Sequence, residues 1–343
     1  MNTDDLTRPE KLGPRLAAAT GDDRWLTHSA RLIAGGKSNL TFELSSAAGA
    51  LVLRRPPSGE LLPSAHDMAR EARVQKALAH SPVPVPEIVL FDKDGDLLGV
   101  PCYVMSKVAG HVIREELPAG YANSAEDRVA MADALVDTLI DLHAVDASTV
   151  GLADFGRPAG FVERQIRRWS GQWDSSATHD VPEVSRLAAL LKQRLPATQR
   201  SSIVHGDFRL DNCLMDESDP TRVAAVLDWE MSTLGDPMTD LGMLLFYWRE
   251  AGEQEYSLVP SATVLPGFPG RRHLAERYAA ATGVSLDEID YYLAFANFKF
   301  AVIAQGIAAR VAAGSMAGQD FGNLDSLVLD CAHAGLEIFD PKG

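Results

Sequence analysis

The sequence is poor in cysteine. Among its 343 residues only Cys102, Cys213 and Cys331 are cysteines, and they lie far apart. An odd number of distant thiols with no C-x-x-C pair argues against a disulfide framework and against a cysteine zinc site. The same pattern is typical of a reducing compartment, so we expect a cytoplasmic protein.

Positive charge and long apolar segments are also scarce. The chain has 32 Lys and Arg against 47 Asp and Glu, a formal net charge of −15. This balance disfavours a nucleic-acid or anionic-membrane partner, although it is compatible with a cationic substrate. The first residues, MNTDDLTRPEK, lack the basic-then-apolar pattern of a signal peptide. The apolar region 293–313 contains Lys299, Gln305 and Arg310, so we expect a core helix there and no membrane span.

The remaining composition is that of a globular protein, with 46% hydrophobic and 23% charged residues. The length has room for two domains or two lobes. Residues 1–22 resemble a polar lead-in with a short helix over 9–19. Alternating apolar residues and turn signals then predict a three-stranded antiparallel meander followed by a helix and two more strands. The strands are expected at 31–34, 40–44, 50–54, 88–91 and 100–105, and the helix at 64–80.

From residue 111 the pattern becomes mostly helical. Helical spacing predicts helices over 125–144, 161–173 and 182–195. Short strands are expected at 203–204 and 223–227, and Asp236-Pro237 is a good start for a helix that ends near 249. The Pro- and Gly-rich stretch 255–270 is predicted to be a surface loop, and long helices close the chain. The fold class is therefore α+β.

Two short motifs carry the chemistry. HGDFRLDN spans residues 205–212, and LDWE follows at 227–230. Together they place Asp207, Asn212 and Asp228 within 22 positions. Phosphoryl transfer needs such a set, in which one carboxylate orients the attacking hydroxyl while an amide oxygen and a second carboxylate hold Mg²⁺. The spacing from Asp207 to Asn212 equals that in the kinase catalytic loop H-R-D-L-x-x-x-N, with Gly206 in place of the Arg.

These motifs, behind a five-stranded lobe and ahead of a helical one, resemble the aminoglycoside phosphotransferase and choline kinase group. The resemblance covers roughly residues 25–335. Several segments are more narrowly similar to the kinase-like domain found ahead of some acyl-CoA dehydrogenases. They are GGKSNLTFEL, LRRPPSG with LLPSAHDMARE, VGLADFGRP, FVERQIRRW and VHGDFRLDNCL through LDWEMSTLGDPMTDL. The resemblance implies a bilobal, protein-kinase-like fold.

The resemblance also implies roles for individual residues. Asp207 would be the catalytic base, and Asn212 and Asp228 the magnesium ligands. Asp228 follows the apolar run 223–227, where a carboxylate is costly unless it faces a cleft or an ion. Arg209 stands where many protein kinases have a Lys near the transferred phosphate; a simple ion pair with Asp211 is the alternative.

His205 is expected to brace the loop, and Asp240 to bond its backbone from early in a helix. Both are therefore expected to give structural support and not to take part in catalysis.

Nucleotide contacts are expected from the first lobe. Arg54 ends the third strand where protein kinases have the phosphate-binding Lys of V-A-I-K. Strand alternation lets only one of Arg54 and Arg55 face the cleft, and we choose Arg54, with Glu71 as its ion-pair partner. A turn of Gly35, Gly36, Lys37, Ser38 and Asn39 would approach the phosphates. By resemblance alone, the hinge residues Met105, Ser106, Lys107 and Val108 would contact adenine.

The sequence thus predicts an ATP- and Mg²⁺-dependent phosphotransferase acting on a hydroxyl of a small molecule. Its expected parts are a lead-in (1–22), a nucleotide-binding N-lobe (23–105), a hinge (106–110) and a C-lobe with the acceptor pocket (111–343). A non-catalytic nucleotide-binding pseudokinase is the alternative, motivated by the Arg in place of Lys. A metal-dependent hydrolase using His205, Asp207 and Asp228 is a third, weaker one. The acceptor, ATP versus GTP, antibiotic resistance and the oligomeric state stay open.

Overall fold

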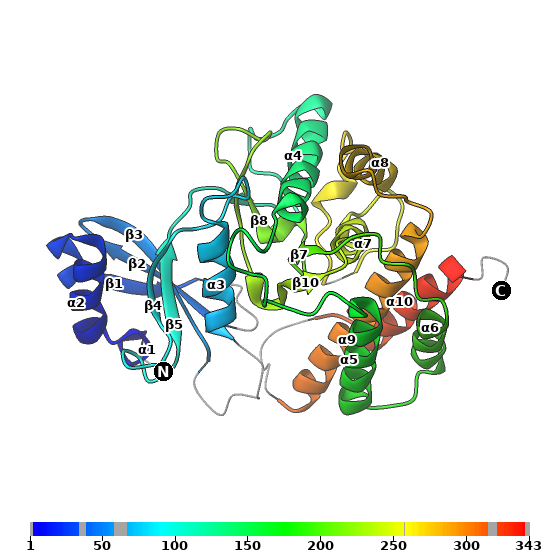
Figure 1. Ribbon diagram of the computed structural model, residues 1–343, viewed down its shortest axis with the longest axis horizontal. Helices are drawn as coiled ribbons and strands as arrows, with labels where there is room; N and C mark the ends of the chain where they lie inside the picture. The colour runs from blue at the N-terminus through cyan, green and yellow to red at the C-terminus, as the bar shows by residue number, and fades with distance from the viewer. Residues whose placement is uncertain (1–2, 34–38, 58–66, 257, 315–320, 340–343) are drawn as a thin grey trace. The chain divides into compact units, whose positions relative to one another are not determined.

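The computed structural model describes residues 3–33, 39–57, 67–256, 258–314 and 321–339 (Figure 1). Two compact units make up the chain. The first comprises Met1–Gly110 together with Ala224–Ser232, and the second comprises His111–Val223 and Thr233–Gly343. The short segment Ala224–Ser232 therefore belongs with the first unit although it lies far along the sequence.

A five-stranded antiparallel sheet forms the centre of the first unit, in the order β1-β2-β3-β5-β4. The strands are β1 (Ser29–Leu32), β2 (Leu40–Ser46), β3 (Gly49–Arg55), β4 (Ile88–Asp92) and β5 (Cys102–Ser106). The helices of this unit are α1 (Thr3–Thr7), α2 (Pro9–Thr20) and α3 (Met68–Leu78). The predicted meander and the two later strands are confirmed, with ends shifted by one or two residues.

Alternation along β3 sends its side chains to two separate cores. Leu51 and Leu53 pack in a cluster with Leu12 and Leu16 of α2. Val52 packs in a second cluster with residues of α3 and β5. Figure 1 shows α2 and α3 on opposite sides of the strands. The same alternation decides the direction of the two arginines that end β3.

The second unit is mostly helical. Its helices are α4 (Ala125–Ala144), α5 (Phe161–Ser176), α6 (Pro182–Gln193), α7 (Met238–Tyr247), α8 (Arg271–Thr282), α9 (Ile289–Ala312) and α10 (Leu324–Phe339). Two short antiparallel pairs join them: β6 (His111–Val112) with β8 (Cys213–Met215), and β7 (Ser202–Val204) with β10 (Thr233–Gly235). The strand β9 (Val223–Val226) begins at the last residue of the segment His111–Val223, and its other three residues belong to the first unit. The predicted bounds of the helix at 125–144 are confirmed without change.

Helix α9 lies at the centre of this unit and packs against α5, α6, α7 and α10. Its length and composition would allow it to cross a membrane, but 72% of the apolar 18-residue stretch within it is buried inside the protein. Its apolar side chains therefore pack in the core, as the sequence predicted. Gly242 of α7 permits a close crossing, because a Cβ there would lie 2.7 Å from the carbonyl oxygen of Tyr292.

The prediction of a surface loop over 255–270 is wrong for the centre of that stretch. Val259, Ala262 and Thr263 are buried, and a short 3-10 turn spans Ala262–Val264. The Ala262 amide donates to the carbonyl of Arg114, and the Thr263 hydroxyl donates to the carbonyl of Arg249. These tertiary hydrogen bonds hold the stretch against the second unit. Residue propensities do not predict them.

Candidate active site

The segment His205–Asn212, here termed the HGD loop, follows β7 and ends in a 3-10 turn before β8. Gly206 has φ of 85°, a left-handed conformation that favours glycine, so the chain turns sharply there. The two successive amides of His205 and Gly206 donate to Oδ2 and Oδ1 of Asp240, at 2.6 and 2.8 Å. One carboxylate at the start of α7 thus holds the backbone of the loop.

Asp240 is buried, and its environment favours the ionised form. Burial acts to raise its pKa, but the hydrogen bond and charge of His143, the charge of His205 and the Gly206 amide together lower the pKa below its usual value. His143 Nε2 lies 3.2 Å from Asp240 Oδ2, and its Nδ1 lies 2.7 Å from the hydroxyl of Tyr278. The loop therefore rests on a fully bonded buried carboxylate.

Asp207 is the carboxylate that the HGD loop presents. Asn212 Nδ2 donates to both its carbonyl oxygen, at 2.8 Å, and its Oδ2, at 3.0 Å. Burial acts to raise the pKa of Asp207, but Arg209, Lys299 and His205 lower it below the usual value. Asp207 is therefore ionised at neutral pH and able to accept a proton.

Arg209 makes three contacts in the same place. Its guanidinium lies 3.2 Å from Asp207 Oδ2, 3.2 Å from Asp211 Oδ2 and 4.6 Å from the ring centroid of Tyr247. The ion pair between Arg209 and Asp211, which the sequence offered as the alternative, is present. Arg209 also contacts Asp207 directly. The guanidinium thus connects the HGD loop with the end of α7.

A second cluster of charges lies within the first unit. Arg54 Nε is 2.8 Å from Glu71 Oε2, and Arg54 Nη2 is 2.5 Å from Asp228 Oδ1. Arg55 points elsewhere and donates to the backbone carbonyls of Leu6 and Pro56. Of the two arginines, Arg54 is therefore the one on the α3 side of the sheet, with Glu71 as the partner expected from the sequence.

Glu71 is fully buried and is held from three sides. Besides Arg54, the Tyr103 hydroxyl donates to its Oε2 at 2.9 Å and Asn39 Nδ2 donates to its Oε1 at 3.1 Å. Burial raises the pKa of Glu71, while Arg54 opposes that shift. The pKa of Arg54 is raised even though burial lowers it, because Asp228 and Glu71 stabilise its charge. Arg54 is thus a permanent cation in this cluster.

Asp228 stands in a strained backbone conformation. Its φ and ψ are 65° and 59°, in the left-handed region that non-glycine residues seldom occupy. Hydrogen bonds hold the chain on both sides of it: Val226 N donates to Pro84 O at 2.8 Å, and Arg70 Nε donates to Ser232 O at 2.8 Å. The surrounding structure therefore fixes where the Asp228 carboxylate lies within the first unit.

The other predicted nucleotide contacts are the turn over residues 35–39 and the hinge over residues 105–108. Gly35, Gly36, Lys37 and Ser38 lie outside the described residues, whereas Asn39 is buried against Glu71. Met105 and Ser106 end β5, and Lys107 and Val108 follow. Ser106 exchanges backbone and side-chain hydrogen bonds with Glu87, and Lys107 pairs with Glu43 at 2.6 Å.

Sequence reasoning missed several participants. Lys299, read as an interruption of an apolar helix, is buried and donates to the carbonyl of Gly206. Tyr103, His143 and Glu230 join the charged clusters from distant segments. A charged residue inside a run that is otherwise buried was the available signal for Lys299. Within the described residues, no three His, Cys, Asp or Glu side chains gather in a way that could hold a metal ion.

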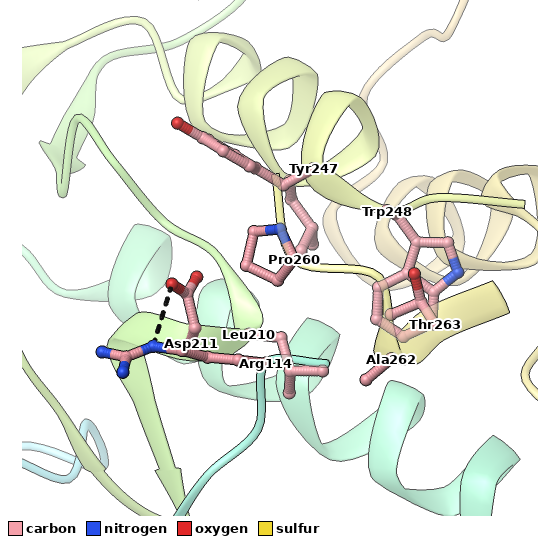
Figure 2. Close-up of a pocket in the computed structure, with 9 residues that line it drawn as sticks. Arg114, Leu210, Asp211, Tyr247, Trp248, Pro260, Ala262 and Thr263 are labelled. Carbon is pink, nitrogen blue, oxygen red and sulfur yellow. Dashed lines mark ion pairs between the residues drawn. The ribbon is translucent and has the colours of Figure 1, made fainter. Parts of the chain in front are cut away.

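A small hollow, partly open to solvent, lies beside the end of the HGD loop (Figure 2). Its walls are mainly apolar, and its lining residues are Arg114, Leu210, Asp211, Leu244, Tyr247, Trp248, Pro260, Ala262 and Thr263. Figure 2 shows Arg114 and Asp211 together at one side, with Arg114 Nε 3.9 Å from Asp211 Oδ2. Burial raises the pKa of Asp211, with Arg209 opposing the shift.

Comparison with known proteins gives concordant matches. The model of the phosphotransferase enzyme family matches residues 29–289. Acyl-CoA dehydrogenase family member 11 from Pongo abelii is 35% identical over 327 residues, which is 93% of this chain and 41% of that protein. The chain thus spans about two fifths of the length of this relative and of the human and chicken proteins of the same name.

Solved structures agree with the family match. A putative aminoglycoside phosphotransferase from Ralstonia eutropha JMP134 is 33% identical, with a TM-score of 0.77 and coverage of 91% of this chain and 92% of that one. A thermostable aminoglycoside phosphotransferase APH(4)-Ia variant, in ternary complex with AMP-PNP and hygromycin B, has a TM-score of 0.61 at 13% identity, with coverage of 96% and 99%. The second likeness is one of fold alone. The α+β, protein-kinase-like fold expected from the sequence is confirmed.

Proposed function

Because this chain belongs to the phosphotransferase enzyme family, as the resemblance in its sequence predicted, we propose that it transfers the γ-phosphate of ATP to a hydroxyl of a small molecule. The observation that carries the proposal is the placement of Asp207. This carboxylate accepts a hydrogen bond from Asn212 and is presented by a loop whose backbone is fixed by Asp240, and its neighbours hold its pKa below the usual value.

Asp207 would accept a hydrogen bond from the acceptor hydroxyl and take its proton as the oxygen attacks phosphorus. Arg209 would offset negative charge that develops on the transferred group, since its guanidinium already lies beside Asp207. His205 and Asp240 would keep the loop in place without touching substrate. The Asp207 amide donates to His205 Nδ1 at 3.2 Å, which supports a bracing role for the imidazole.

The donor chemistry fits Mg²⁺, which prefers carboxylate and amide oxygens. Asn212 engages Asp207 through its amide nitrogen, so its Oδ1 is the atom suited to bind a cation. Asp228 offers a carboxylate that is about a third exposed and held in a strained conformation, as residues at ligand sites often are. When bound, Mg²⁺ would neutralise charge on the nucleotide phosphates.

Arg54 would bind nucleotide phosphates and Glu71 would hold its guanidinium in position. Residues 35–39 would approach the phosphates through backbone amides, and residues 105–108 would contact adenine. The AMP-PNP in the solved complex of the APH(4)-Ia variant supports an adenine nucleotide as the donor.

The hollow beside the HGD loop is the proposed acceptor site. Tyr247, in its wall, packs against Arg209 at 4.6 Å from ring centroid to guanidinium, and the Arg209 Nε lies 3.2 Å from Asp207 Oδ2, so one side chain separates the hollow from the proposed base. Its acidic lining residue, Asp211, is already paired with Arg209, and the remaining walls are largely apolar. A polycationic aminoglycoside needs several free carboxylates, so this lining favours an alcohol with an apolar body. Hydroxylated acyl compounds are one such class, and the relatives' acyl-CoA dehydrogenase names agree with it.

A panel of acceptors tests this proposal. Purified protein with ATP and Mg²⁺ is offered aminoglycosides, choline-like amines, sugars and hydroxyacyl thioesters, and ADP release is measured. Acceptor-dependent ADP release, greatest for an alcohol with an apolar body, is the expected result. Turnover of aminoglycosides alone would refute the acceptor assignment, and no turnover with any alcohol would refute the activity.

The second candidate function, a non-catalytic nucleotide-binding module, is favoured by one observation. Arg54 engages Glu71 and Asp228 together, so an internal cation sits on the proposed metal ligand. A thermal shift measured with ATP, with and without Mg²⁺, separates the two candidates when it is read beside the acceptor panel. Nucleotide stabilisation without ADP release under any condition would support the module.

A further inference from the structure

Lys299 stands out because an ammonium group is buried in a helix that is otherwise mostly apolar. Its side chain is 3% exposed, and it lies near the middle of α9. Its Nζ donates to the carbonyl oxygen of Gly206 and lies 5.4 Å from the ring centroid of Trp169. Burying an unpaired charge is costly, so the surroundings must compensate. Asp207 and Asp240 supply the nearby negative charge, with Arg168 and Arg209 acting against it.

Lys299 contacts the peptide group that joins Gly206 to Asp207. The carbonyl of Gly206 and the amide of Asp207 belong to the same planar unit. Lys299 holds the oxygen of this unit, and His205 Nδ1 accepts from its N–H at 3.2 Å. On the other side of Gly206, its own amide is held by Asp240 Oδ1 at 2.8 Å. Three side chains therefore fix a turn at a glycine, which by itself is free to rotate.

We propose that Lys299 is a positioning residue for phosphoryl transfer: by holding the carbonyl of Gly206, it orients the peptide that carries Asp207 and so aims the proposed base. The inference rests on the proposed function. Lys299 touches neither the reacting atoms nor the nucleotide in this assignment, and it acts through Asp207. It therefore contributes to turnover and not to nucleotide affinity.

The first test uses Lys299→Met, with the exposed Lys192→Met on α6 as the matched control. Because misplacing a catalytic group by about 1 Å can cost roughly 100-fold in rate, the expected loss in kcat is about 10- to 100-fold. The KM for ATP should stay within about threefold, because nucleotide-binding residues are untouched. Lys192→Met should match wild type. Circular dichroism and the thermal midpoint establish that each variant is folded.

A double-mutant cycle separates positioning from general loosening of the structure. If Lys299 acts through Asp207, adding Lys299→Met to Asp207→Asn lowers the residual kcat no further. Lys299→Arg, which keeps a cationic donor, should recover part of the lost turnover. Independent, multiplicative effects of the two substitutions would overturn the inference. So would a folded Lys299→Met variant whose kcat lies within about twofold of wild type.

If the Met variant does not fold, Lys299→Gln carries the test, because its polar end suits the buried polar surroundings. A lower kcat at unchanged KM for ATP supports positioning, and wild-type kcat in the folded Gln variant overturns it. The activity of the wild type shows whether the proposed function or only the role of Lys299 has failed. A wild type that transfers no phosphate refutes the proposed function. A transferring wild type with an unaffected variant refutes the role of Lys299 alone.

Discussion

At the scale of residues, the two aspartates around the HGD loop differ in what their oxygens do. Both Asp240 oxygens are occupied by loop amides, and Oδ2 also contacts His143. Asp207 instead receives a side-chain amide and a guanidinium on Oδ2. Asp240 therefore has a structural role. Asp207 has an oxygen, Oδ1, that is suited to accept a hydrogen bond from the acceptor's hydroxyl.

Asp240→Asn should destabilise the protein by about 3 kcal/mol, because a neutral amide cannot accept from both loop amides and leaves a buried donor unpaired. The measurement is urea unfolding at pH 7. The exposed Asp174→Asn on α5 is the matched control and should stay near the wild-type stability. A loss below about 0.5 kcal/mol for Asp240→Asn would contradict the account of the loop.

The same carboxylate gives a pH dependence with a defined sign. Since the pKa of Asp240 is lower in the folded protein, its contribution is fully present above the ordinary Asp pKa, about 3.9, and is lost as pH falls through the folded value. Wild type should therefore lose more stability than Asp240→Asn on acidification below about pH 4. Parallel losses would assign acid sensitivity to other groups.

The sequence predicted part of this residue-scale picture. Asp207 and Asn212 lie in one short motif, and the structure places them in hydrogen-bond contact. Asp228 was predicted beside them as a metal ligand, a role that stays a prediction. Lys299 and Tyr103 reach the two clusters from segments whose local pattern predicts only a buried helix or strand. Such long-range pairings depend on tertiary packing, which periodicity does not encode.

At the scale of elements, the Arg54–Glu71 pair joins β3 to α3. Removing the cation leaves a fully buried carboxylate unpaired, so Arg54→Met should cost about 3–5 kcal/mol. Replacing both partners with Met should recover a large part of that loss, because no buried charge is then orphaned. Urea unfolding of the two single variants and the double variant measures the coupling. Additive losses would show that the pair does not link these elements.

The crossing of α7 and α9 is a second element-scale test. A Cβ on Gly242 would lie 2.7 Å from the carbonyl oxygen of Tyr292, so Gly242→Ala should destabilise by about 1–3 kcal/mol. Gly171→Ala on α5 is the control, since a Cβ there meets no atom within 4 Å. It should stabilise by about 0.5–1 kcal/mol through helix propensity. Thermal unfolding of both variants gives the comparison, and equal midpoints would contradict the close packing.

Elements with a strong period were predictable, and short ones were not. The helix at 125–144 and the alternating strands around β3 follow directly from apolar spacing. The strands β6, β8 and β10 contain two or three residues each, too few to show a period. Their positions come from the pairing of distant segments, as does the inward path of residues 259–263.

At the scale of the whole molecule, the candidate residues divide between the two compact units. Arg54, Glu71 and Asp228 belong to the first, and Asp207 and Asn212 belong to the second. Each unit therefore holds its own part of the proposed chemistry in fixed hydrogen bonds and ion pairs. Nucleotide affinity should therefore depend mainly on the first set of residues, and turnover on the second.

The most direct test compares Asp207→Ala with wild type in two assays, nucleotide binding and phosphate transfer to the best acceptor. If Asp207 is the general base, transfer by the variant falls by about 100- to 10,000-fold, while the Kd for ATP changes little. Full transfer by the Asp207→Ala variant on a confirmed acceptor would contradict it.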